Sequence, residues 1–297
     1  MVATAPETPE TIDIQKCIHP WEESRFWLGV CVTIPIIVIF IFATGWVAIF
    51  AILGVILAAW FATQIFKAHL LGSAAEVSED NFPEIHQLLV QVCKQLNYPE
   101  KVEVYVYQDG DVNAFLVRLF STRLIMLPHE LVVGMSDDQT RTELIWILAR
   151  SVGHLKAKHL RLWLLRILIE GFENLLFLNL FLYPWERATH YTGDRIGLAA
   201  CGDLGAALKA INKLMLGNAL SGKTTLLGAL KQRRRLSGTF FGWLAQSLSS
   251  HPHMTYRIAS LISWSKTYNP PAYECFIQTQ ANRDQIESLI QMSTSVL

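Results

Sequence analysis

The stretch ELIWILARSVGHLKAKH, residues 143–159, decides how the rest of this chain is interpreted. Its apolar residues recur with helical spacing, and Ser136-Asp-Asp-Gln139 just before it resembles a capping box. We therefore expect a helix over about 139–159. Side chains four residues apart share one face of a helix, so Arg150 and His154 should project in the same direction.

This helix resembles the motif helix of the HtpX-like membrane zinc metallopeptidases, relatives of the CAAX prenyl proteases. Members of that family carry a helix of the form E-L-x-x-V-x-A-H-E-x-G-H-x-x-x-x-H. The matching positions in this chain are Glu143, Leu144, Ala149, Gly153, His154 and His159.

Three further landmarks of that family follow the same order along the chain. One matches the strand beside the substrate cleft, one the segment that carries the third zinc ligand, and one a late histidine–proline and arginine element. The residues at these landmarks are Asn113, Ala114 and Phe115, then His190 and Asp194, then His251 and Arg257.

The departures from the family pattern fall on the residues that zinc chemistry needs. An H-E-x-x-H helix works because its two imidazoles reach one metal and its glutamate takes a proton from the bound water. Here Arg150 stands at the first ligand, Ser151 at the general base and His190 at the third ligand, where the family has glutamate. An arginine cannot deprotonate in a protein, and a serine hydroxyl is no substitute base near neutral pH. Of three ligands, at most His154 and His190 are left.

We therefore expect no zinc and no other cofactor; any metal that did bind would use those two histidines. His159 lies five residues beyond His154 and should point off the shared face. We further hypothesise that Arg150 and Asp194 form a bidentate ion pair that fills the vacated site.

The N-terminal part of the chain indicates membrane anchoring. Residues 1–25 are polar and interpreted as a tail, whereas 26–66 carry no charge and are about twice as long as the roughly 20 residues that one helix needs to span a bilayer. Thr44-Gly45 offers a turn, which predicts a hairpin of two helices over about 26–43 and 46–66. Basic residues flank the hairpin and none lies in its turn, so we place residues 67–297 on the cytoplasmic or equivalent side.

Residues 67–297 have the pattern of a peptidase-like domain. We expect an α+β, gluzincin-like fold that is mostly helical, with one small sheet from 102–107, 114–119 and 123–127. The apolar segment 160–185 contains arginines and glutamates. It fits an interfacial amphipathic insertion or a buried helical hairpin equally well.

Several partner classes are not expected. The 25 basic and 25 acidic residues leave no excess of positive charge for nucleic acid. Residues 217–224 match a nucleotide-binding P-loop letter for letter, but no hydrophobic strand precedes them, so nucleotide is not expected. The five scattered cysteines predict free thiols.

The resemblance together with its departures predicts a pseudopeptidase. Such a protein would bind an extended segment of a membrane protein at a strand edge without cutting it, in assembly, quality control or regulation. The alternative is an active zinc metalloendopeptidase with an altered ligand set.

Overall fold

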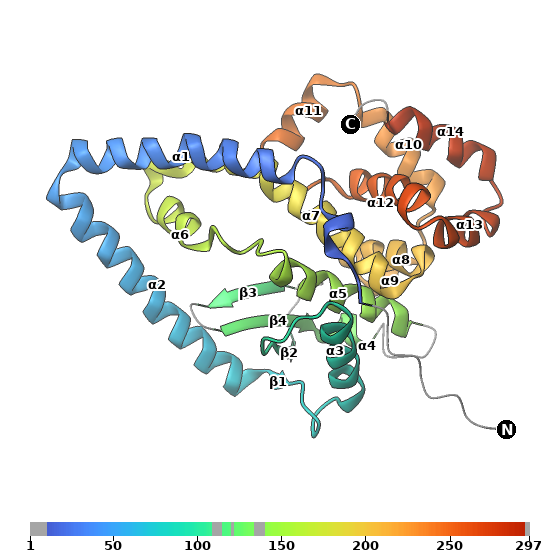
Figure 1. Ribbon diagram of the computed structural model, residues 1–297, viewed down its shortest axis with the longest axis horizontal. Helices are drawn as coiled ribbons and strands as arrows, with labels where there is room; N and C mark the ends of the chain where they lie inside the picture. Colours follow the sequence, from blue (N-terminus) through green and yellow to red (C-terminus); the bar gives the residue numbers. More distant parts are fainter. Residues whose placement is uncertain (1–10, 109–114, 120–121, 134–139, 295–297) are drawn as a thin grey trace.

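The computed structural model describes residues 11–108, 115–119, 122–133 and 140–294. The predicted fold class, mostly helical with one small sheet, is confirmed (Figure 1). The helices of the first half are α1 (Glu22–Thr44), α2 (Trp46–Ser73), α3 (Pro83–Gln95), α4 (His129–Val133) and α5 (Arg141–Lys156). The second half contains α6 (Trp163–Gly171), α7 (Asn179–Cys201), α8 (Leu204–Leu216), α9 (Asn218–Ser221), α10 (Leu226–Leu236), α11 (Phe240–Ser247), α12 (Met254–Tyr268), α13 (Pro270–Gln278) and α14 (Arg283–Thr294). Two short 3-10 turns complete the order, η1 (Ile14–Cys17) and η2 (Glu173–Leu178).

Helices α1 and α2 form the predicted apolar pair. They meet at Gly45, whose φ of 61° is open to glycine because it has no side chain to clash. Both are long and apolar enough to cross a membrane, and most of their surface is uncovered by the rest of the chain. Figure 1 shows α1 and α2 meeting at one end of the molecule and diverging toward the domain as a V-shaped arm. Each helix extends past the predicted span on the side of the domain.

The segment before α1 packs on the domain over part of its length, whereas the sequence indicated a polar tail. The Cys17 side chain is buried in the main core. The Ile12 amide donates to the Gln95 carbonyl at 2.9 Å, and the His19 ring stacks on Tyr191. The start of the first apolar helix is therefore attached to the domain.

The sheet has four strands in the order β1-β2-β4-β3, namely β1 (Ala75–Glu76), β2 (Glu103–Tyr107), β4 (Thr122–Pro128) and β3 (Phe115–Leu119). Strands β2 and β4 run parallel, while β1 and β3 are antiparallel to their neighbours. Val104 and Ile125 face the main core, and the alternate residues Tyr105 and Met126 face Leu70 at the end of α2. The three predicted strands are confirmed, and β3 lies at an edge of the sheet.

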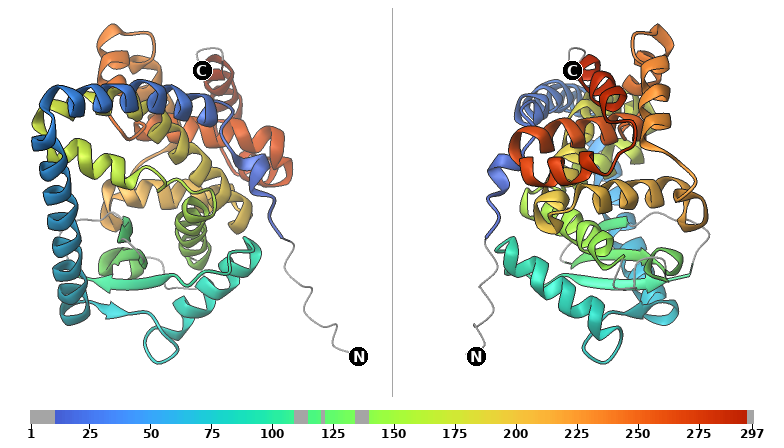
Figure 2. Two further views of the ribbon diagram at one scale, coloured as in Figure 1. Left: turned by 60° about the vertical axis from the view of Figure 1, so that its left-hand side comes forward. Right: turned by 90° about the vertical axis from the view of Figure 1, so that its right-hand side faces the viewer.

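The apolar segment 160–185 folds against the long helices. Ile169 and Leu182 are buried in a small cluster against Ile36 and Phe40 of α1. Figures 1 and 2 show α6 on the inner side of the arm that α1 and α2 form. The segment therefore packs against the apolar pair of helices.

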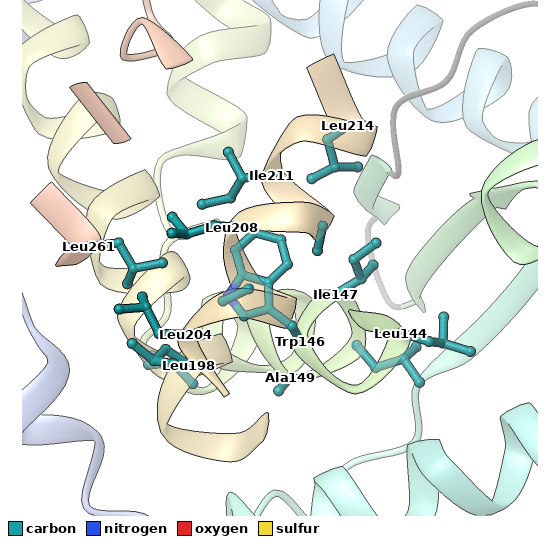
Figure 3. Close-up of a cluster of buried hydrophobic side chains, with 14 of the residues drawn as sticks. Leu144, Trp146, Ile147, Ala149, Leu198, Leu204, Leu208, Ile211, Leu214 and Leu261 are labelled. Carbon is teal, nitrogen blue, oxygen red and sulfur yellow. The ribbon is translucent and has the colours of Figure 1, made fainter. Parts of the chain in front are cut away.

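Helix α5 lies at the centre of the domain, packed between α3, α7 and α8. Trp146 is fully buried among leucines of α8 and α12 (Figure 3). Its indole Nε1 donates to the Asp194 carbonyl of α7 at 3.2 Å. A Cβ at Gly197 would lie 2.7 Å from that same Nε1, and one at Gly153 would lie 2.7 Å from Ile196. Small residues on both helices thus allow α5 and α7 to cross closely, which brings Arg150 next to Asp194.

Residues 217–224 lie between two helices. Gly217 ends α8 and the short α9 follows at once, so a helix and not a strand leads into the P-loop letters. The context that nucleotide binding requires is therefore missing. All five cysteines lie in the part of the chain that the structure describes and are free.

Candidate functional site

The motif helix lines a cavity of about 400 Å³ beside its crossing with α7. Helix α12 and the segment around α6 close the other sides. The lining of the cavity includes Arg150, His154, His159, Trp163, Arg166, Trp185, Glu186, His190, His251, Met254 and Arg257.

Asp194 is the centre of the charged groups in this site, and its side chain is almost fully buried. Arg257 of α12 donates to both carboxylate oxygens, from Nε at 2.8 Å and from Nη2 at 2.7 Å. Arg150 donates to Oδ1 from Nε at 3.0 Å. The predicted contact between Arg150 and Asp194 is confirmed, but the bidentate geometry belongs to Arg257. Because Arg257 engages both oxygens, Arg150 approaches from the side and takes one shared bond.

The free end of the Arg150 guanidinium reaches the third-ligand position. Its Nη2 lies 2.8 Å from His190 Nδ1. A guanidinium only donates, so Nδ1 of His190 accepts and the imidazole is neutral. Burial, with Arg150 nearby, holds the pKa of His190 well below its usual value. Burial and the neighbouring Arg257 lower the pKa of Arg150 to about 10, which leaves it charged at neutral pH.

His159 contacts His154, contrary to the prediction that it points off the shared face. The two Nδ1 atoms are 2.7 Å apart. Helix α5 ends at Lys156 in a Schellman motif, with Lys158 at a φ of 58°. In that motif the His159 amide donates to the His154 carbonyl at 3.0 Å and the Lys158 amide to Leu155 at 3.1 Å. The chain folds back over the helix end, which the helical period could not predict.

Glu22, at the start of α1, is a site residue that the sequence did not reveal. It is 6% exposed and its Oε1 lies 3.0 Å from His159 Nε2. The Thr192 hydroxyl of α7 donates to its other oxygen. A glutamate just before an apolar run is interpreted as a flanking charge, and nothing local separates Glu22 from Glu23. Only the packing of the start of α1 against α7 distinguishes it.

His154 itself is buried and close to the backbone of α7. A Cβ at Gly193 would lie 2.3 Å from its Nε2, so only glycine fits there. That Nε2 has no hydrogen-bond partner within the described ranges. Burial, together with Arg150, lowers the pKa of His154 well below its usual value. The His154 imidazole is therefore neutral and packs against α7.

The remaining predicted residues are divided between the cavity and other places. His251 lies at the cavity rim, with its ring centroid 4.6 Å from that of His190. Ser151 is buried in α5 and does not line the cavity. Phe115 begins edge strand β3, whereas Asn113 and Ala114, like the predicted capping box at 136–139, lie outside the described residues.

The donor set does not fit a zinc ion. The guanidinium of Arg150, at the position that matches the first ligand, donates to Nδ1 of His190, so the lone pair on that nitrogen is already used by a cation. In the described ranges no group of three histidine, cysteine, aspartate or glutamate side chains is placed to hold a metal ion.

Comparisons with known proteins cover the motif helix and the residues on either side of it. The sequence model of peptidase family M48 matches residues 79–171 and 163–265, which together cover more than half of the chain. A curated relative is the plastoglobule-localized metallopeptidase 48, chloroplastic, of Arabidopsis thaliana. It is 25% identical over 228 residues, which are 69% of this chain and 63% of the relative. The alignment thus spans less than two thirds of that relative's length. No solved structure matches.

Proposed function

Because the chain belongs to peptidase family M48, we propose that it is a membrane-anchored metallopeptidase homologue that has lost catalysis and binds segments of membrane proteins. Assembly, quality control or regulation of membrane proteins would use such binding. The loss of catalysis is supported most directly by the bond from Arg150 to His190, which joins the first-ligand and third-ligand positions to each other.

Loss of catalysis is supported by three features of the site. Arg150 places a fixed positive charge where a divalent metal would sit, and its partner Asp194 is shared with Arg257. Ser151 at the base position is buried away from the cavity. His154 is turned toward His159 and Gly193. A hydrolytic water would have neither a metal nor a base to activate it.

Retention of binding is supported by the strand edge and the cavity. Strand β3 (Phe115–Leu119) has one partner, β4, among the described strands, so its outer edge is open to backbone pairing. An extended segment can add to such an edge without any catalytic group. The cavity of about 400 Å³ provides a pocket on the same domain.

Membrane anchoring is supported by α1 and α2. Both expose large apolar side chains, with Phe42 84% and Trp46 79% exposed around the turn at Gly45. Such a surface is stable in hydrocarbon and unfavourable in water. Lys16, Arg25 and Lys67 flank the pair, and we place the domain on the cytoplasmic or equivalent side by the positive-inside rule.

Zinc content and proteolysis of the detergent-purified full chain test the loss of catalysis. We expect zinc well below one per chain and no cleavage of casein. His154→Ala should change neither result. The control His86→Ala, on α3 outside the cavity, should also leave both unchanged. Stoichiometric zinc together with cleavage that His154→Ala abolishes and His86→Ala keeps would establish the active enzyme instead.

Photocrosslinking in native membranes tests the binding role. A crosslinking amino acid within Phe115–Leu119 should capture membrane proteins, whereas one at the exposed Gln285 of α14 should not. Equal capture from both positions would remove the support for recognition at the strand edge.

A further inference from the structure

Helix α11 presents three neighbouring aromatic side chains outside the core. Phe240, Phe241 and Trp243 are 66%, 78% and 63% exposed. The centroid of the Phe240 ring lies 5.4 Å from that of Phe241 and 6.0 Å from that of Trp243, so the three rings form one continuous apolar surface. Such a surface is unfavourable in water and indicates a site of contact with another apolar surface.

A basic face lies directly before these aromatic residues in the chain. Lys231, Arg234 and Arg235 of α10 are three and four residues apart, so they share one face of the helix, and all three are exposed. Residues 204–273 contain lysines and arginines but no aspartate or glutamate, although the net charge of the whole chain is zero. Positive charge is therefore concentrated in this part of the sequence.

The carboxylates of the neighbouring helix do not neutralise this basic face. Helix α14 packs against α10 and carries Asp284 and Glu287. Glu287 is bonded to Arg283 of its own helix at 3.1 Å. Over the ranges that the structure describes, neither carboxylate forms an ion pair with the three basic side chains of α10. The basic face is therefore available to anions outside the chain.

The turn between α10 and α11 holds the basic face and the aromatic side chains in a fixed relation. The Thr239 hydroxyl accepts from the Gly242 amide at 3.1 Å and donates to the Leu236 carbonyl at 2.9 Å. A Cβ at Gly242 would lie 2.5 Å from that carbonyl oxygen, so the two helices meet closely. The α10–α11 surface, as we call it, consists of Lys231, Arg234, Arg235, Phe240, Phe241 and Trp243.

Helix α11 is attached close to the point where α1 begins its apolar run. Arg187 of α7 donates to the Ser249 carbonyl, just after α11, at 2.7 Å. Two residues earlier on α7, the Trp185 ring packs on Phe26, the first residue of the uncharged run, at 5.6 Å between centroids. The neighbouring Trp27 is exposed, as is typical of a membrane–water interface. In Figures 1 and 2, α11 projects from the domain on the side where α1 lies.

We propose that the α10–α11 surface lies on the membrane beside α1, with its aromatic side chains in the interfacial region and its basic side chains on anionic lipid headgroups. Aromatic residues next to lysine and arginine are typical of segments that lie in a bilayer interface. A protein partner would have to combine an acidic and an apolar face, whereas an anionic bilayer offers both next to the anchor. The inference rests on membrane anchoring by α1 and α2, and it does not depend on the loss of catalysis. This contact sets the orientation of the domain over the bilayer.

Fluorescence quenching in nanodiscs tests this contact on the full chain, with one copy in each nanodisc. The fluorescent amino acid Anap replaces Phe241 or, as a control, the exposed Gln285 of α14. A lipid with a nitroxide near the headgroup end of its acyl chain is the quencher. In a mixture of phosphatidylcholine and phosphatidylglycerol, it should remove at least about half of the fluorescence at Phe241 and little at Gln285.

Charge variants test the role of the basic face. The test variant combines Lys231→Gln, Arg234→Gln and Arg235→Gln, and its matched control combines Lys94→Gln, Lys101→Gln and Arg141→Gln at three other exposed positions. The test variant should reduce quenching at Phe241 at least about twofold, as should replacing phosphatidylglycerol by phosphatidylcholine, whereas the control variant should not. If the test variant does not fold by circular dichroism, raised salt on the unchanged chain replaces it, because salt screens contacts with headgroups.

Equal quenching at Phe241 and Gln285 would overturn the inference, and so would quenching at Phe241 that neither the charge variant nor the loss of phosphatidylglycerol reduces. Fluorescence at Phe241 that lipid does not quench, but that changes between nanodiscs with one and two copies, would assign the surface to a second copy of the chain instead. Anap in place of Phe50, exposed on α2, reports the anchor itself. Quenching at Phe50 without quenching at Phe241 removes only this inference, whereas no quenching at either position removes the proposed membrane anchoring as well.

Discussion

Removing the charge of Asp194 is the most direct perturbation of the site. In Asp194→Asn the side chain keeps its size, but Arg150 and Arg257 lose the carboxylate that accepts three hydrogen bonds from them. Asp194 is 1% exposed, so water cannot replace it. Breaking a buried ion pair by removing one partner costs about 3 to 5 kcal/mol, and we expect the free energy of unfolding to fall by that amount.

Arg150→Met provides the matched comparison. It removes one guanidinium, but Asp194 keeps both bonds from Arg257, and His190 loses a single donor. The cost should be about 1.5 to 3 kcal/mol, the range of a hydrogen bond to a charged group. Arg257→Met should fall between the two changes, because it removes two of the three bonds to the carboxylate.

Urea unfolding in detergent, followed by the fluorescence of the nine tryptophans, measures these differences. The order Asp194→Asn, Arg257→Met, Arg150→Met, from largest to smallest cost, is the expected result. An Asp194→Asn cost below about 1 kcal/mol would refute the idea that one carboxylate holds two buried cations. So would an Arg150→Met cost equal to that of Asp194→Asn.

Three other changes test separate parts of the site. Burial holds the pKa values of His154 and His190 below their ordinary 6.5, so these histidines take up protons in the unfolded chain first as the pH falls. The free energy of unfolding should therefore be full above about pH 7 and decrease below about pH 6.5, by about 1.4 kcal/mol per pH unit for each histidine. Urea titrations at a series of pH values measure this decrease. Gly193→Ala should lower the melting temperature by an amount that corresponds to about 1 to 3 kcal/mol, since its Cβ would lie 2.3 Å from a buried imidazole, whereas Gly222→Ala, with nothing within 4 Å, should not. Glu22→Gln should cost about 1 to 3 kcal/mol and increase hydrogen exchange at the start of α1; unchanged exchange there would show that Glu22 does not attach the helix.

Much of the fold could be predicted because the signals are local. The uncharged run 26–66 with Gly45 inside it predicts two apolar helices, and three short β-like runs predict β2, β3 and β4. The short strand β1 was not predicted, because two residues are too few to show an alternating pattern. The hypothesised ion pair between Arg150 and Asp194, which rested on the family resemblance, also implied that the segments around these two residues meet.

That an arginine at 150 cannot ligate a metal, and that a serine at 151 is no substitute for a carboxylate base, follows from the sequence itself, because this side-chain chemistry does not depend on the surroundings. Tertiary structure alone decided which arginine binds Asp194 through both oxygens, since Arg257 comes from a helix 63 residues away. It also decided that His159 returns to His154, through a turn at Lys158, and that Glu22 enters the site from the first apolar helix. Periodicity describes neighbours along one element, whereas these contacts depend on where separate elements cross.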